Sequence, residues 1–165
     1  MHQSGHYGAA LIVYAPTAGV LVAFGLEQFA FIGGLITLGL AMAPDLDMRA
    51  PFVEHRGITH TVHFAFLVGV LLAAVFGGIG FTRGIGTAAL TATYGFVIGF
   101  GTISSHIAAD ALTPMGIEPF RNGRRYSLDV VKAANPIGNY LLLALGVVAV
   151  GLAFVVGTTV AGTVA

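Results

Sequence analysis

The sequence predicts an all-α fold, a polytopic membrane helix bundle of about five transmembrane helices forming a single domain over residues 1–165. The composition is the first reason: 56% of the residues are hydrophobic and 8% are charged, whereas a soluble domain carries roughly 25% charged residues. The second reason is that the charges gather in a few places and leave five long uncharged stretches. These stretches lack the period-two alternation of half-buried strands, so their length favours helices.

The uncharged stretches cover residues 1–26, 28–44, 57–82, 84–109 and 133–165. A membrane-spanning helix needs about 20 apolar residues, with a range of roughly 17–25, and each stretch reaches that minimum. The second stretch is the shortest, because at about 1.5 Å per residue it extends about 26 Å across a ~30 Å core. A re-entrant second segment is therefore the alternative to five full spans. No Lys or Arg precedes the first apolar run, so we expect a retained span there and no cleaved signal peptide.

Five spans put the N-terminus, the 44–58 loop and the 113–134 loop on one side of the membrane. Six of the seven basic residues lie in these two loops, and Arg83 alone lies on the other side. The positive-inside bias makes the loop side cytoplasmic, so we expect an integral protein of the cell or inner membrane with an external C-terminus. The zero net charge indicates no nucleic-acid partner. Cysteine is absent, which excludes disulfides and thiolate ligands.

Candidate metal ligands come from four segments that end on this loop side. His106 and Asp110 are four residues apart and share one helix face. Asp110 follows 26 uncharged residues, and an ionisable group at membrane depth is costly and usually functional. Imidazole and carboxylate ligands suit zinc, and also manganese or iron. The sequence thus predicts a divalent metal centre of one or two ions, zinc first, with these candidate ligands: His6, Asp45, Asp47, His60, His106 and Asp110.

Other histidines are expected to have simpler roles. A lone histidine at a helix end is usually an interfacial residue or a cap, and we interpret His2 and His63 in this way. We expect the third helix to begin near Gly57 with Thr59 as its N-cap, which would put His60 and His63 on one face. Which aspartate of the Asp45/Asp47 pair binds metal stays open.

Such a centre could hydrolyse esters, because a bound divalent ion activates water and clamps the oxygens of a phosphoester displacement. Asp110 would be the central ligand, His55 or the spare aspartate of Asp45 and Asp47 the general base, and Arg56 a substrate contact. Guanidinium groups match phosphate oxygens, which makes the basic loop with Arg121, Arg124 and Arg125 the candidate substrate-binding segment. An ordinary cytoplasmic loop touching anionic lipid heads is an equally weighted interpretation of that loop.

The chain resembles the YdjM-like family of membrane-bound, metal-dependent hydrolases, some of them regulated by LexA. The resemblance rests on an early Gly-His pair, on PDLD at 44–47, on HRGITHT at 55–61 and on SHIAADALTPMG at 105–116. It continues into the arginine-containing segment through Tyr126 and covers positions 5 to about 140. The combination of the HRGxTH and SHxxxDxxTPxG patterns is specific.

The family is similar, more remotely, to zinc-dependent phospholipases C. That resemblance implies an all-α enzyme whose ligands fall here on His6, Asp45 or Asp47, His60, His106 and Asp110. The ligands of a third metal have no counterpart after Asp110, which favours one or two ions. We therefore expect a membrane-embedded hydrolase that acts on a phosphoester or ester of a lipid or lipid-linked substrate. The alternatives are a metal or proton conductor, which would need ionisable groups through the membrane depth, and a scaffold with a structural metal.

Overall fold

The computed structural model describes residues 1–49, 52 and 55–164, so the middle of the 44–58 loop, including Glu54, lies outside the described residues. Five long helices dominate the chain, and two short 3-10 helices, η1 and η2, precede the third of them. The elements are α1 (Gln3–Ala23), α2 (Glu27–Leu40), η1 (Pro44–Arg49), η2 (Ile58–His60), α3 (Val62–Phe81), α4 (Ile85–Ala111) and α5 (Pro136–Val164). Within the described residues, β-structure is limited to an isolated bridge between Ile117 and Tyr126. The predicted all-α fold is confirmed.

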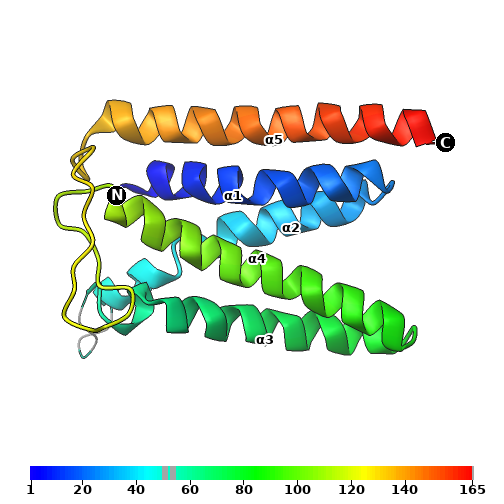
Figure 1. Ribbon diagram of the computed structural model, residues 1–165, viewed down its shortest axis with the longest axis horizontal. Coiled ribbons are helices and arrows are strands. Elements are labelled where there is room, and N and C mark those ends of the chain that lie inside the picture. Colours follow the sequence, from blue (N-terminus) through cyan, green and yellow to red (C-terminus); the bar gives the residue numbers. More distant parts are fainter. Residues whose placement is uncertain (50–51, 53–54, 165) are drawn as a thin grey trace.

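Helices α1, α3, α4 and α5 run between the same two ends of the molecule, and α2 starts at the end with the C-terminus and stops short of the other (Figure 1). Each is long and apolar enough to cross a membrane, provided that α2 is taken together with η1 as Glu27–Arg49. The N-terminus, η1, η2 and the α4–α5 connection at 112–135 lie at one end, which we call the loop end. The C-terminus and the tight α1–α2 and α3–α4 turns lie at the other. The alternation expected for five spans is therefore present.

The second span is completed by 3-10 structure. Helix α2 has 14 residues and, at about 1.5 Å each, extends only about 21 Å. The chain continues the span through η1, which carries both aspartates of the PDLD sequence. As a result Asp45 and Asp47 are 8% and 4% exposed although they follow a short helix. The re-entrant alternative is not what the structure adopts.

The start of the third helix differs from the expectation. Helix α3 begins at Val62, and Thr61 is its N-cap because its hydroxyl oxygen accepts a hydrogen bond from the Phe64 amide at 3.1 Å. The predicted cap, Thr59, lies in η2 and donates instead to Asp47. The change of backbone direction at Thr61 buries His60 and leaves His63 exposed. The expectation that these two histidines share a face was therefore wrong.

The helices pack in two close pairs, α1 with α5 and α3 with α4, and α2 packs against α1 and α4. Small residues allow the close approach, as is common between membrane helices. A Cβ on Gly8 would collide with the backbone of Leu142, and one on Gly146 would lie 2.5 Å from the Gly8 carbonyl oxygen. This contact fixes the N-terminal half of α1, which carries His6, against α5.

We predict that Gly8→Ala lowers the stability of the protein by about 1–3 kcal/mol, because an added methyl overpacks the α1–α5 contact. Gly151→Ala is the matched control on α5, since a Cβ there meets nothing within 4 Å. Thermal unfolding of the two variants in detergent measures the difference. Equal melting temperatures would contradict the packing described here.

Candidate metal centre

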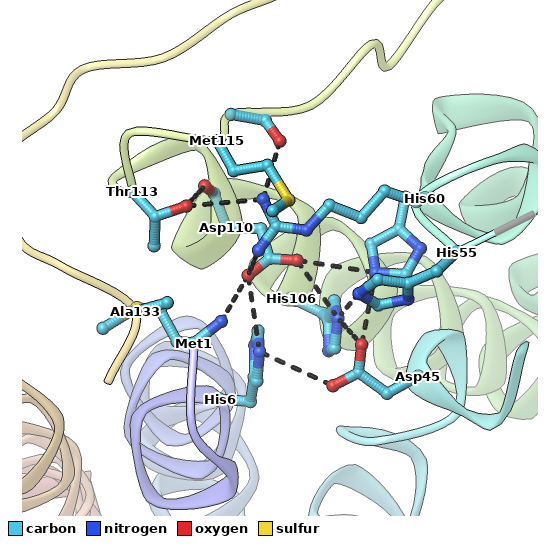
Figure 2. A network of polar contacts seen from close by, with 12 residues as sticks. Met1, His6, Asp45, His55, His60, His106, Asp110, Thr113, Met115 and Ala133 are labelled. Carbon is cyan, nitrogen blue, oxygen red and sulfur yellow. Dashed lines mark hydrogen bonds and ion pairs between the residues drawn. The ribbon is translucent and has the colours of Figure 1, made fainter. Parts of the chain in front are cut away.

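A group of polar side chains from four elements meets at the loop end (Figure 2). His6 comes from α1, Asp45 from η1, His60 from η2, and His106 and Asp110 from α4. The three histidines are 0% exposed and Asp110 is 1% exposed. Sequence positions separated by a hundred residues thus form one buried cluster, as the sequence predicted.

Four donor atoms in this cluster have the spacing of a tetrahedral ion site. The Nε2 atoms of His60 and His106 are 3.2 Å apart, and each lies 3.4 Å from Asp45 Oδ1. Asp110 Oδ2 lies 3.5 Å and 3.8 Å from the same two nitrogens. Zinc with bonds of about 2.0–2.1 Å to such ligands requires edges of about 3.3 Å in a tetrahedron. These four residues also have ligand atoms within 4.8 Å of one another.

The ring orientations leave this point without a proton donor. His106 Nδ1 lies 2.7 Å from the Ala41 carbonyl oxygen, which only accepts, so Nδ1 carries the proton and Nε2 presents a lone pair. His60 Nδ1 lies 3.0 Å from Thr59 Oγ1, whose own proton goes to Asp47. Neutral His60 therefore also presents a lone pair at Nε2, beside two carboxylates. Four acceptors meeting in a buried site need a cation between them.

Protonation of His60 is one way to supply that positive charge. Burial alone would lower the pKa of His60, but its hydrogen bonds to Asp110 and Asp45 raise the pKa above the ordinary histidine value. The carboxylates that attract the proton are the ones that would attract a divalent ion. The donor set accordingly fits a metal of the kind predicted from the sequence.

His6 faces the other side of the two carboxylates. Its Nε2 lies 3.8 Å from Asp45 Oδ2 and 3.6 Å from Asp110 Oδ1, while its ring stacks on His106 with centroids 3.7 Å apart. Neither ring nitrogen of His6 has a hydrogen-bond partner among the described residues. Asp110 Oδ1, however, is also bound by the Met1 nitrogen and by Arg56 Nη2. Cationic groups thus already neutralise this second side.

Asp47 lies outside the four-atom site and supports it. Its Oδ2 accepts a hydrogen bond from the Thr59 hydroxyl and lies 3.4 Å from His60 Nδ1, and its Oδ1 lies 2.9 Å from His55 Nδ1. The Arg56 backbone amide donates to Oδ2 as well. A carboxylate on the far nitrogen of a ligating histidine fixes the ring orientation and its tautomer. Within the PDLD pair, Asp45 therefore belongs to the four-atom group, while Asp47 belongs to a second possible metal group with His55 and His60.

Arg56 connects the cluster to a polar cavity of about 220 Å³. Its Nη2 donates to Asp110 Oδ1 at 2.9 Å and its Nη1 to the Gly116 carbonyl at 2.8 Å. The cavity is also lined by His55, Arg121 and Arg125, three residues that the sequence singled out. Arg124, predicted with them, is exposed and does not line the cavity.

Two supporting groups were missed from the sequence. The Ala41 carbonyl, which orients His106, carries no signal in a side chain. Asn139 on α5 is 1% exposed; its Oδ1 accepts the His2 amide and its Nδ2 donates to the carbonyls of Ala133 and Asn135. This fastens the start of α1, and therefore His6, to α5. A lone amide near the start of an otherwise apolar span was the available signal.

Fold and cluster together define the class: a polytopic membrane protein with a buried histidine–aspartate site able to hold a metal ion. The particular family follows from its family model. The YdjM inner membrane protein model matches residues 1–164, so the chain belongs to that family. No curated protein gives a match, and no solved structure gives one.

We predict that His106→Ala and Asp45→Ala abolish stoichiometric binding of zinc, because each removes one corner of the four-atom site. His63→Ala is the control, since His63 is exposed at the same end of the bundle. Metal analysis of the purified, zinc-loaded proteins supplies the measurement. Unchanged zinc content in the two cluster variants would refute the assignment.

Asp47→Asn should weaken zinc binding by about 10–100-fold without abolishing it, because the supporting carboxylate orients His60 and raises its basicity. A competition titration with a chelating indicator measures the affinity. A complete loss, equal to that of Asp45→Ala, would instead make Asp47 a direct ligand.

Proposed function

We propose that this protein is a membrane-embedded, metal-dependent hydrolase that acts on a phosphoester or related ester of a lipid or lipid-linked substrate. The metal is held by Asp45, His60, His106 and Asp110, with zinc as the first candidate and manganese or iron as alternatives. His6 lies on the second side of the two carboxylates, where the Met1 nitrogen and Arg56 already bind Asp110, so one ion is favoured and a second ion beside His6 would have to displace these groups. The bound ion would supply an activated water and a Lewis acid for the ester.

The observation that carries this proposal is the cavity beside the cluster. A structural zinc site is closed by four protein ligands, whereas a catalytic one keeps a position for water; with four side chains on the ion, water or substrate would have to enter here as a fifth ligand. Here Arg56 lines a polar cavity and at the same time holds Asp110, a proposed ligand. An ester bound in the cavity would contact Arg56, which separates the cavity from the cluster and is hydrogen-bonded to Asp110, and zinc accepts a fifth ligand during reaction.

The chain's own residues have separate roles in this proposal. Arg56 orients Asp110 and offers positive charge to the oxygens of the ester. His55 lines the cavity, is held at Nδ1 by Asp47 and is 39% exposed in its side chain, so its other nitrogen is available to move a proton. Asp45 and Asp110 hold the ion, and Asp47 keeps both His55 and His60 in position.

The same proposal includes an orientation in the membrane. Six of the seven basic residues belong to the loop end, and the positive-inside bias therefore assigns this end to the cytoplasm. Substrate would then reach the cavity from the cytoplasmic leaflet.

The test is hydrolysis by the purified, metal-loaded protein in mixed micelles of phosphatidylglycerol and phosphatidylethanolamine, with products identified by mass spectrometry. We expect turnover that Asp110→Asn abolishes, by at least about 10³-fold, because the ion and its activated water are lost. Arg83→Gln at the opposite end should leave the rate unchanged. Retained turnover in Asp110→Asn would exclude the proposed site, and stoichiometric metal without turnover on any ester would favour a structural metal.

A further inference from the structure

Three arginines line the cavity beside the cluster. Its charged lining consists of Arg56, Arg121, Arg125 and one acid, Glu118. Glu118 lies 3.5 Å from Arg125 Nη2 and Asp110 lies 2.9 Å from Arg56 Nη2, so two of the three guanidinium groups have a carboxylate partner. Arg121 makes no ion pair within the part of the chain that the structure describes, and Arg56 is only 11% exposed. The cavity therefore favours an anion with the geometry of a phosphate or carboxylate.

Two of these arginines have an unusual backbone conformation. The described non-glycine residues with positive φ are Arg56, Arg121 and Asp129, at 60°, 50° and 48°, a left-handed conformation that a non-glycine residue adopts only at an energetic cost. Two such residues line one cavity. Strained backbone of this kind gathers at ligand-binding positions.

Exposed apolar side chains surround the loop end. They come from η1, η2 and the described residues of both connecting loops, and each is at least half exposed: Met48, Phe52, Ile58, Phe120, Leu128 and Val130. Exposed apolar residues rimming a polar site mark a surface that contacts a membrane or a partner. In a chain whose five helices cross the bilayer, these loops adjoin the headgroup layer and can insert their side chains there. The cavity would then lie at the depth of lipid phosphates.

We propose that this cavity is a binding subsite for the phosphate of a membrane phospholipid, with Arg121 as its principal contact. The proposed subsite depends on the proposed function only in that the bound lipid is also the substrate. Binding of the lipid by itself requires no turnover. The guanidinium of Arg121 binds the phosphate oxygens, Arg125 adds charge, and Arg56 directs the ester towards the metal cluster. The apolar rim holds the cavity against the headgroup layer.

The experiment measures binding of dioctanoyl phosphatidylglycerol to the full-length, metal-loaded protein in a zwitterionic detergent at fixed ionic strength. Arg121→Gln should weaken binding about tenfold or more, as expected for the loss of a charge-assisted hydrogen bond. Arg124→Gln is the matched control, because it removes the same charge from the same loop but outside the cavity. We expect its affinity to stay within about twofold of the unmodified protein, since an exposed charge contributes little.

Glycerol 3-phosphate serves as the second arm and distinguishes a lipid phosphate from a soluble one. It should fail to displace the lipid, because it lacks the chains that reach the apolar rim. Displacement at a comparable concentration would overturn the lipid assignment in favour of a soluble phosphate ester. Equal weakening by Arg121→Gln and Arg124→Gln would overturn the subsite in favour of general surface charge. Selective binding without any product would leave the subsite standing and refute the hydrolase proposal alone.

Discussion

Repulsion among acceptor atoms is the constraint on which the loop end of this bundle depends. Asp45, His60, His106 and Asp110 direct oxygen and nitrogen lone pairs at one buried point, with two nitrogens 3.2 Å apart. Buried acceptors of this kind are costly unless a cation lies among them. The energy gained when a cation binds would stabilise the fold as well, because the four side chains come from three elements, η1, η2 and α4.

The surrounding structure keeps the four atoms in place. The Ala41 carbonyl holds His106 from the end of α2, while Thr59 and Asp47 hold His60 from the adjoining turns. These contacts explain why α2 stops early and why a 3-10 helix follows. In the 3-10 helix, the side chain of Asp45 points towards Nε2 of His60 and that of Asp47 points towards Nδ1 of the same ring. A regular helix continuing through Pro44 would not place the two aspartates in this way.

The sequence predicted the fold, and it predicted that His6 and His106 lie at the same end of the bundle, because both follow from long-range patterns. The uncharged stretches determine where the spans lie. Because successive spans run in opposite directions, the start of the first and the end of the fourth, with His6 and His106, lie at the same end. The roles of individual residues within the site depend on the directions of their side chains, which cannot be derived from the spacing of residues in the sequence. Asp45 and Asp47 are two residues apart and equivalent in sequence, yet their side chains face different nitrogens of His60. The helix cap is at Thr61 and not at Thr59 for the same reason, since the change of backbone direction at Thr61 determines which hydroxyl faces the first turn of α3.

The location of the ionisable groups favours the proposed hydrolase over a metal or proton conductor. In the described part of the chain, Glu27 and Arg83 are exposed at the end opposite the cluster. Between the two ends, the buried polar groups are hydroxyls such as those of Tyr14 and Thr37. A conduction path would have to cross that region with titratable groups, whereas a hydrolase needs them only where substrate and water arrive. A single concentrated site beside arginines at one end of the bundle is the arrangement expected of the proposed hydrolase.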